Sequence, residues 1–523
     1  MTTIITAKIG TAKGGISRIW LEGQKLIHAG VRVGAKYVQK QGGNSQRLEL
    51  VPTESSDESR GFKVSKRERN GVVYPLLEIR TDLIAAMFKG CEKVRVAIRA
   101  GRIVVSALHV DLKIRERVER LKRKLAAKEK LAIGSIFHGG GVMDSAMHRG
   151  MLAVGVASFV MFAVEVEPIY LDSSLRNNRE LFTEDSYVIN SDIRDLDLLG
   201  GVPQIDCLHL GLPCTGASRS GKAKNKIEFA EEHQDVGALF HDFLNVVAAG
   251  NPALITMEQV VDFSSAAGMA VIRSVLRKQG YELYETVLNG ADFGAIEARD
   301  RLVLVAVTKG LDFGLPFMFP SSHPQVAARG ARTLGDVLED IPLDSPMWKT
   351  YDYLAEKEVR DLADGKGFKR ALVTGSVSTI GTQGKGYAKA RSTEVQLIHP
   401  TNPKLSRLLT PVEHAGVKGI PVCVIEGLSP TRAHEVLGQS VCYAKFEALG
   451  YAVGSFLQGL ALPSEYLVPP VVADGHDGIT DYCGQVCGGG ECGAGAVCQY
   501  GIDPETRMPA PAVPVQLDFL EVA

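Results

Sequence analysis

The sequence predicts an α/β protein built on a doubly wound, mostly parallel sheet, with a β-rich module before it and an insertion near its end. Four apolar runs alternate with helical segments and each ends at a glycine-rich or polar loop: 131–137, 158–164, 205–210 and 253–257. Short β-rich runs separated by turn residues occupy the first 110 residues. A stretch rich in glycine, serine and threonine, 309–405, interrupts the pattern before it resumes.

The first 110 residues are expected to form a small β-sandwich or barrel that binds DNA or dimerises. Its expected strands are 17–21, 31–38, 47–51, 71–79, 94–98 and 101–105. The basic cluster from Lys63 to Arg69 suits phosphate contacts, although a solvated basic loop is the simpler explanation. Residues 111–130 predict a basic connecting helix with a charged solvent face, or a helix that lies along DNA phosphates.

Composition limits the class of protein. At 523 residues the chain is long enough for about three domains. The 59 Lys and Arg residues nearly balance the 60 Asp and Glu residues, so any nucleic-acid contact must come from local patches. The sequence shows no secretory signal or membrane-spanning run, and we expect a cytoplasmic protein. Nine cysteines, an odd number, argue against a disulfide framework.

The strand 131–137 and the two units after it predict a nucleotide-type cofactor site. A glycine turn, Gly139 to Gly141, lets the backbone approach a ligand closely. The next strand ends at Glu165, and a carboxylate about this far downstream can bind both hydroxyls of a ribose. In the third unit, Asp192 is placed to accept a hydrogen bond from an adenine amino group while Ile193 packs on the ring.

Cys214 follows the strand 205–210 after Gly-Leu-Pro, which places its thiol on a loop at the strand's carboxyl end. Ligands bind at that edge of an open α/β sheet, so the thiol is placed for chemistry. A buried structural cysteine is the alternative, because free cysteines are usually core residues.

The residues around Cys214, Gly-Leu-Pro-Cys followed by Gly-Ala-Ser, resemble the nucleophile loop of DNA cytosine-5 methyltransferases. Further segments follow in the family's order: Glu258-Gln-Val, Asp292-Phe-Gly with two arginines, Arg407-Leu-Leu-Thr-Pro-Val-Glu, and Leu437-Gly-Gln-Ser-Val. The resemblance implies a Rossmann-like methyltransferase fold and S-adenosylmethionine as cofactor. It also implies methyl transfer to carbon 5 of cytosine in a specific DNA sequence, through a covalent cysteine adduct and base flipping.

The resemblance implies a role for each motif. Cys214 is the implied nucleophile at carbon 6 of the base, and Glu258 the implied acid at ring nitrogen 3. Arg301, with Arg299 nearby, is expected to clamp the cytosine carbonyl oxygen. The residues implied in cofactor binding are Phe137, Gly139, Gly141, Glu165, Val166, Asp192, Ile193, Pro213, Gln439 and Ser440.

The resemblance further implies a catalytic domain over 131–308 and 406–460, with a target-recognition domain inserted at 309–405. Four residues of this insertion are expected to contact double-stranded DNA, with a solvated loop as the alternative: Lys385, Tyr387, Lys389 and Arg391. The tail, 461–523, holds four cysteines that could bind zinc, but none of their gaps has the common two-residue spacing, so a tail without a metal is the favoured interpretation: Cys483, Cys487, Cys492 and Cys498. A cognate restriction endonuclease is a further expected partner, and the oligomeric state stays open.

The sequence departs from the family pattern in ways that keep two rival functions open. Thr215 and Ala217 alter the nucleophile loop, Gln259 and Gln439 replace asparagines, and Val166 stands where the family often has tryptophan. Ile296 and Glu297 replace a Pro-Gln pair. One rival keeps the chemistry and acts on RNA, as one branch of the family does on transfer RNA. The other is a non-catalytic DNA-binding protein.

Overall fold

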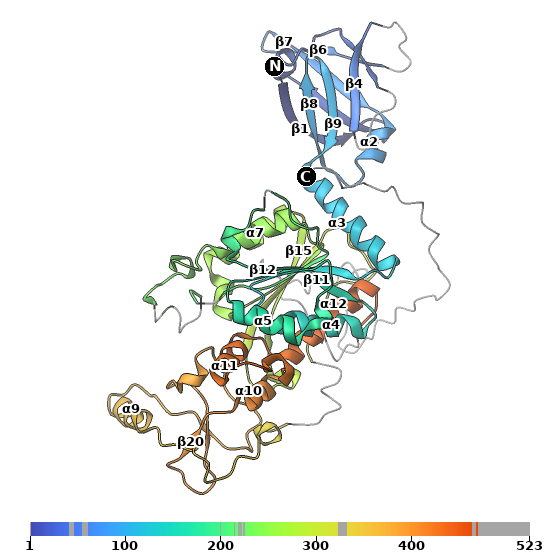
Figure 1. Cartoon of the computed structure of the whole chain (residues 1–523). Helices are drawn as coiled ribbons and strands as arrows, with labels where there is room; N and C mark the ends of the chain where they lie inside the picture. Colours follow the sequence, from blue (N-terminus) through green and yellow to red (C-terminus); the bar gives the residue numbers. More distant parts are fainter. Residues whose placement is uncertain are drawn as a thin grey trace, which may run out of the picture. The chain divides into compact units, whose positions relative to one another are not determined.

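The structure is a computed structural model that describes residues 2–40, 47–54, 61–198, 200–213, 215–217, 222, 225–322, 332–462 and 467–468. Three parts follow one another along the chain (Figure 1). They are an N-terminal β module, a seven-stranded α/β sheet with its helices, and a largely irregular segment whose last helices return to the sheet.

The N-terminal module is all-antiparallel, and its strands pair in the order β5-β3-β4-β9-β8-β1-β2-β7-β6. Its elements are β1 (Thr2–Thr11), β2 (Ser17–Glu22), α1 (Gln24–His28), β3 (Lys36–Gln39), β4 (Arg47–Thr53), β5 (Gly61–Lys63), β6 (Ser65–Arg69), β7 (Val72–Arg80), α2 (Asp82–Met87), β8 (Lys93–Arg99) and β9 (Arg102–Ala107). β1 has no counterpart among the predicted strands, and residues 31–35 form a turn before β3 rather than its first part.

The two halves of this module repeat one another. The first part of β1 pairs with β8, and its last part pairs with β2. β5 and β6 together take the place of β1 in the other half: β5 pairs with β3, and β6 pairs with β7. β2 pairs with β7 and β4 with β9, so one pseudo-twofold axis relates all of these strand pairs. Each half also has two positive-φ residues at its first hairpin turn, Gly14–Gly15 and Asn70–Gly71. The module is therefore an internal duplication.

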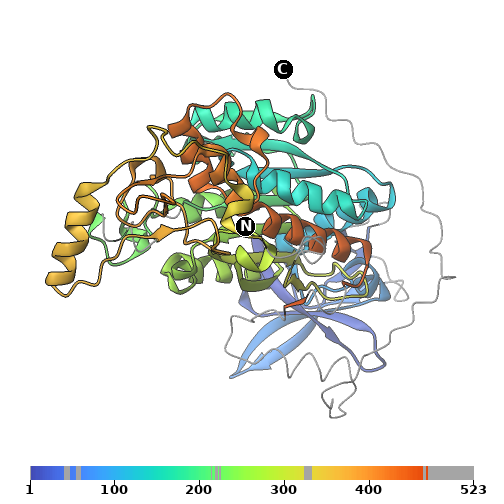
Figure 2. The ribbon, with the colours of Figure 1, turned by 90° about the horizontal axis from the view of Figure 1, so that it is seen from below.

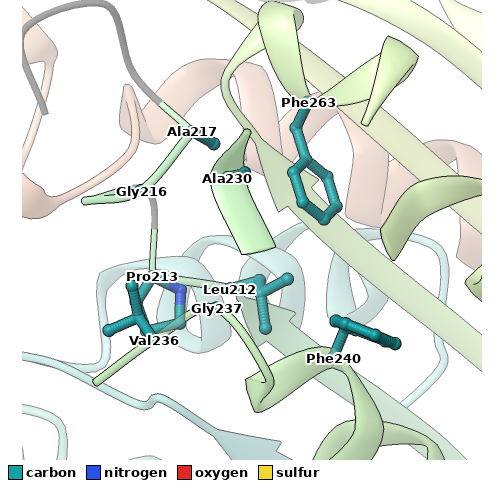
Figure 3. A pocket seen from close by; sticks show the side chains of 9 residues that line it. All are labelled: Leu212, Pro213, Gly216, Ala217, Ala230, Val236, Gly237, Phe240 and Phe263. Atoms are coloured by element: carbon teal, nitrogen blue, oxygen red, sulfur yellow. The ribbon is translucent and has the colours of Figure 1, made fainter. Parts of the chain in front are cut away.

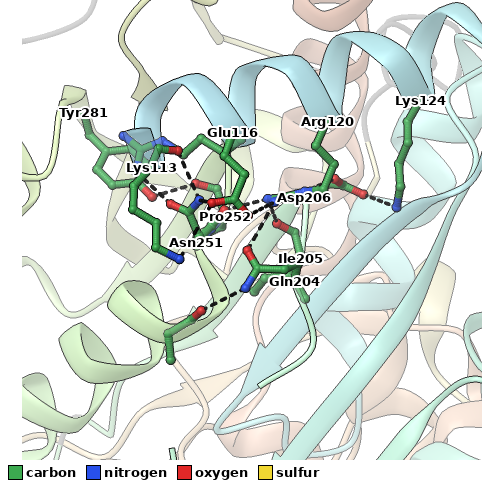
Figure 4. Close-up of polar contacts among 12 residues, drawn as sticks. Lys113, Glu116, Arg120, Lys124, Gln204, Ile205, Asp206, Asn251, Pro252 and Tyr281 are labelled. Carbon is green, nitrogen blue, oxygen red and sulfur yellow. Dashed lines mark hydrogen bonds and ion pairs between the residues drawn. The ribbon is translucent and has the colours of Figure 1, made fainter. Parts of the chain in front are cut away.

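Helix α3 (His109–Ala126) lies where the connecting helix is predicted, and three of its basic side chains face the protein rather than solvent. Arg117 is 2% exposed and its guanidinium lies 3.8 Å from the centre of the Tyr281 ring. Arg120 and Lys124 bind the buried carboxylate of Asp206 at 3.1 and 2.7 Å (Figure 4). These three cations contact the central sheet and the loop that precedes β13, so the expectation that they lie in solvent or along DNA is wrong for them.

The central sheet has the order β12-β11-β10-β13-β14-β16-β15, with β16 antiparallel to both of its neighbours and the other described pairs parallel. Strand order reverses between β10 and β13, as the predicted doubly wound sheet requires. Its elements are β10 (Leu131–Ile136), α4 (Val142–Ala153), β11 (Ser158–Glu165), α5 (Pro168–Asn177), β12 (Tyr187–Asn190), β13 (Cys207–Gly211), α7 (Leu239–Gly250), β14 (Leu254–Gln259), α8 (Ala267–Lys278), β15 (Tyr281–Asn289) and β16 (Asp300–Thr308).

Helices cover both faces of this sheet (Figure 1). On β16, Val303 and Val305 pack with α4 and the last long helix, whereas Leu304 and Ala306 pack with α7 and α8. Burial on both faces explains why these strands are continuous apolar runs rather than alternating ones.

Residues 309–462 form the insertion and the return to the sheet. The elements from here on are β17 (Phe319–Pro320), α9 (Asp352–Ala363), β18 (Leu372–Val373), β19 (Gln396–Ile398), β20 (Ser406–Arg407), α10 (Pro411–Lys418), α11 (Pro430–Gln439), α12 (Tyr443–Gln458) and β21 (Leu467–Val468). In both views α12 lies beside α4 (Figures 1 and 2). A Cβ on Gly450 of α12 would lie 2.3 Å from the Met147 carbonyl of α4, so this contact requires glycine.

Asp206→Ala tests the anchoring of α3. The change leaves Arg120 and Lys124 partly buried without their carboxylate, so we expect the free energy of unfolding to fall by about 3 to 5 kcal/mol. Urea unfolding measures the loss. The matched control is Glu129→Ala, which removes the exposed pair with Arg123 and should change stability by about 0.5 kcal/mol or less. Equal losses in the two variants would contradict the anchor.

Candidate functional site

The described site residues gather at the carboxyl ends of β10, β11, β13 and β14. Within the sheet, Glu165 at the end of β11 is in register with Asn190, and Gly211 at the end of β13 is in register with Glu258. The reversal of strand order between β10 and β13 leaves a crevice position at this edge, where ligands bind in open α/β sheets. The edge therefore brings the predicted cofactor and chemical halves together.

The glycine turn after β10 has the backbone that its sequence requires. Gly139 and Gly141 have φ of +58° and +73°, and Gly141 begins α4. A Cβ on Gly139 would meet open space, whereas one on Gly140 would lie 2.8 Å from Val436 of α11. The turn thus has room for a ligand on one side and packs closely on α11 on the other. Phe137 also has a positive φ of +55°.

Glu165 is fixed by backbone amides at the end of β11. Its Oε2 accepts a hydrogen bond from Gly139 N at 2.7 Å, and its Oε1 accepts one from Glu167 N at 3.0 Å. The side chain is 8% exposed, and the following Val166 is 59% exposed. This arrangement orients a carboxylate beside the glycine turn, and a carboxylate in this position can bind both hydroxyls of a ribose.

The third predicted cofactor position has partners within the protein. The Asp192 carboxylate accepts hydrogen bonds from Arg194 N and Nε, both at 2.9 Å, and from Arg194 Nη2 at 2.5 Å. An adenine amino group would have to share this carboxylate with Arg194. Ile193 is 5% exposed and belongs to the core beneath the edge, so little of its side chain is left for an aromatic ring.

Cys214 lies outside the described residues, but the chain on both sides of it is held in place. Gln259 Nε2 donates a hydrogen bond to the Leu212 carbonyl at 3.0 Å, and Gln259 itself is 1% exposed. On the other side, a Cβ on Gly216 would lie 2.6 Å from the Ala230 carbonyl. Apolar side chains line a pocket around the loop (Figure 3), namely Leu212, Pro213, Ala217, Ala230, Val236, Phe240 and Phe263.

Glu258 and Arg301 form an ion pair next to this loop. Arg301 Nε lies 2.8 Å from Glu258 Oε1, and the two side chains are 11% and 12% exposed. Glu258 Oε2 lies 3.7 Å from the position of a Cβ on Gly211, three residues before Cys214. An acid, a cation and a thiol-bearing loop thus meet at one edge of the sheet.

Arg299 and Arg301 pair with different carboxylates, Glu297 and Glu258. Arg299 Nη1 lies 3.3 Å from Glu297 Oε1, and its side chain is largely buried. The extended segment therefore presents both arginines next to acids: Arg301 beside Glu258, and Arg299 beside Glu297.

A family model described as C-5 cytosine-specific DNA methylase matches residues 133–455, which span the whole of this edge. The chain belongs to that family. Type II methyltransferase M.NlaX of Neisseria lactamica is 28% identical to it over 279 residues, 52% of this chain and 82% of the relative. Type II methyltransferase M.HhaI of Haemophilus parahaemolyticus is 26% identical over 277 residues, 49% of this chain and 78% of the relative.

Among solved structures, the crystal structure of S. pombe Dnmt2 methyltransferase aligns with a TM-score of 0.47 at 18% sequence identity. The alignment covers 63% of this chain and 98% of that chain.

The strip expected to contact DNA divides into exposed and buried residues in this methylase. Lys385, Lys389 and Arg391 are exposed. Tyr387 is fully buried, donates its hydroxyl hydrogen to the Val395 carbonyl at 2.8 Å and accepts a hydrogen bond from Leu409 N. The expectation that Tyr387 contacts DNA is therefore wrong, because its ring lies in the core. The local sequence pattern alone does not distinguish a buried tyrosine from an exposed one at this position.

The closing segment reaches the glycine turn at the sheet edge, through Val436 of α11. Gln439 ends α11 and is exposed, and Ser440 Oγ donates to the Val436 carbonyl at 2.7 Å. The four cysteines of the tail lie outside the described residues. Within the described ranges, no group of His, Cys, Asp or Glu side chains is arranged to hold a metal ion. Among the described helices, none has both the length and the apolar character that crossing a membrane requires.

Asp144 links the two halves of the edge and was not among the predicted site residues. Its Oδ1 lies 2.9 Å from His209 Nδ1 on β13, and its Oδ2 lies 3.0 Å from His138 Nδ1 in the glycine turn. Burial favours the neutral acid, but hydrogen bonds from both histidines hold the pKa of Asp144 below its usual value. Two sequence signals could have indicated this network: His209 inside the apolar run of β13, and His138 directly after the strand that precedes the glycine turn.

Glu394→Gln tests whether burial beside the exposed strip raises the pKa of this carboxyl group. Burial raises the pKa of Glu394 to about 7, against hydrogen bonding from Gly384 and the charge of Arg391. The folded protein therefore binds the proton more tightly than the unfolded chain, so the stability from this group is present below about pH 4.5 and is lost as pH rises through 7.

We expect Glu394→Gln to flatten the decline in unfolding free energy between pH 4.5 and 7 and to add about 1 to 3 kcal/mol at pH 8. Urea unfolding at several pH values measures both. Glu129→Gln, at an exposed site, should keep the wild-type profile. An unchanged slope in Glu394→Gln would contradict this account.

Proposed function

We propose that this chain transfers the methyl group of S-adenosylmethionine to carbon 5 of cytosine in a specific sequence of double-stranded DNA. The transfer proceeds through a covalent adduct between Cys214 and a base flipped out of the duplex. The observation that carries the proposal is the pairing of Glu258 with Arg301, 2.8 Å apart, beside a loop anchored on both sides of Cys214. Membership of the methylase family supports the same chemistry.

Carbon 5 of cytosine is too weak a nucleophile to attack a methyl group by itself, and Cys214 activates it by adding to carbon 6. The Cys214 thiolate forms a bond to carbon 6, and the electron pair of the 5,6 double bond moves toward carbon 5. Gln259 holds the Leu212 carbonyl before the thiol-bearing residue, and Gly216 after it packs closely on the Ala230 carbonyl. Because carbon 6 is inaccessible inside a base stack, the cytosine must leave the duplex.

Glu258 and Arg301 act on the pairing edge of the flipped cytosine. Glu258 protonates or hydrogen-bonds ring nitrogen 3 as that nitrogen gains electron density. Arg301 holds the carboxyl group and donates to the carbonyl oxygen from the same fork of N–H groups. Loss of the carbon 5 proton and departure of the Cys214 thiolate then restore the aromatic ring.

The glycine turn and Glu165 would hold S-adenosylmethionine. When bound, the cofactor supplies the methyl group that carbon 5 attacks. The open space at Gly139 and the fixed carboxylate of Glu165 fit a nucleoside at the end of β11. The remaining residues assigned to this site are Phe137, Gly141, Val166, Asp192, Ile193, Pro213, Gln439 and Ser440.

The insertion is assigned to sequence recognition through Lys385, Lys389 and Arg391, and the N-terminal module to phosphate contact or dimerisation. The Type II names of the relatives support a cognate restriction endonuclease as partner. The non-catalytic alternative rests on residues that depart from the family pattern. It loses support at Gln259, because this side chain holds the Leu212 carbonyl of the Cys214 loop.

Cys214→Ser is expected to abolish methyl transfer while S-adenosylmethionine binding survives, because the nucleophile and the glycine turn are separate parts of the edge. Bisulfite sequencing of DNA from cells that express the protein reads the transfer, and calorimetry reads the binding. Cys423→Ser, at an exposed free cysteine, is the matched control and should keep full activity. Methylation that persists in Cys214→Ser would contradict the mechanism. Transfer to RNA but not to duplex DNA would favour the RNA alternative.

A further inference from the structure

Glu297 and Lys418 form a buried ion pair where the arginine segment, the recognition insertion and the closing helices meet. Lys418 Nζ lies 2.5 Å from Glu297 Oε2, and both side chains are 0% exposed. Glu297 comes two residues before Arg299, and Lys418 is the last residue of α10. A buried pair of this kind has to be well partnered, because both charges have left water.

The other oxygen of Glu297 serves the two elements that would meet the DNA. Glu297 Oε1 accepts a hydrogen bond from Gln383 N at 2.9 Å, and Arg299 Nη1 lies 3.3 Å from the same oxygen. Gln383 opens the strip that carries Lys385, Lys389 and Arg391. Ala298 N also donates to the Ile380 carbonyl at 2.9 Å, so the strip and the arginine segment are bonded along their backbones. One carboxylate thus sets the position of both.

Lys418 determines how strongly that carboxylate holds Arg299. The Coulomb attraction of Lys418 and Arg299 offsets the burial of Glu297 and keeps its pKa below the usual value. With Lys418 present, the cluster of one acid and two cations keeps a net positive charge. Without Lys418, the acid would be left to Arg299 alone, and the guanidinium would be neutralised and drawn away from the base.

We infer that Glu297 and Lys418 are a coupled pair of positioning residues for the methyl transfer, and that they set Arg299 and the recognition strip against the flipped base. Glu297 stands where family members resembling this chain have glutamine, and Lys418 supplies the charge that this acid requires. The inference rests on the proposed function. It explains the departure at Glu297 as a compensated exchange rather than a loss of activity.

Three variants of the full-length chain test the pair: Glu297→Gln, Lys418→Gln and the double variant. Each single change leaves a buried charge without its partner, and we expect kcat to fall by about tenfold or more, since small misplacements of binding groups carry losses of this size. The double variant restores charge balance and should recover kcat to within about threefold of wild type. Transfer to plasmid DNA from labelled S-adenosylmethionine measures kcat, and bisulfite sequencing reads the sequence context methylated.

The matched control is Glu413→Gln on α10, the helix that also carries Lys418. It breaks a buried ion pair with Arg407 of β20, at 2.6 Å, away from the arginine segment. We expect Glu413→Gln to lower the unfolding temperature, which circular dichroism measures together with the folded fraction. Its kcat, corrected for the folded fraction, should stay at the wild-type value. A double variant that regains stability without regaining kcat would overturn the inference, as would single variants whose kcat follows only the folded fraction. A wild-type protein that methylates no DNA would instead overturn the proposed function, and the recovery of stability would still be measurable.

Discussion

The carboxylate of Glu297 is the constraint on which the arrangement of the site depends. A charge buried at this depth must be satisfied on every side, and its partners come from separate parts of the chain: Lys418 from α10, Arg299 from its own segment and Gln383 from the insertion. These partners lie more than eighty residues away in sequence, apart from Arg299. The acid therefore joins the recognition insertion to the catalytic sheet, and it does so next to the arginines assigned to the base.

Elsewhere in the site, hydrogen bonds between side chains and backbone groups fix the parts on either side of the crevice. Glu165 is held by the amides of Gly139 and Glu167, and Gln259 holds the Leu212 carbonyl. The parallel strands make this arrangement possible, because the carboxyl ends of four neighbouring strands, and the loops that follow them, lie at one edge of the sheet. The described side chains of this edge are therefore oriented by contacts within the protein.

The sheet, the connecting helix and the edge loops could be predicted because apolar runs, glycine turns and their order are local signals. The family motifs extended that prediction to single residues such as Glu258. What could not be predicted depends on contacts between distant segments. The burial of Tyr387 and the docking of Arg120 on Asp206 appear only once the insertion and α3 are folded against their neighbours. The repeat within the N-terminal module appears in the pairing of its strands, which joins segments far apart in sequence.

The central claim is that this edge of the sheet builds a covalent bond between Cys214 and cytosine. Duplex DNA in which the target cytosine is replaced by 5-fluorocytosine tests it most directly, because fluorine cannot leave carbon 5 as a proton does and the adduct cannot break down. With S-adenosylmethionine present, the account predicts a protein–DNA complex that survives denaturation, with the modified peptide mapped to Cys214. An enzyme that methylates ordinary DNA but forms no such complex, or that is trapped through another residue, would contradict it.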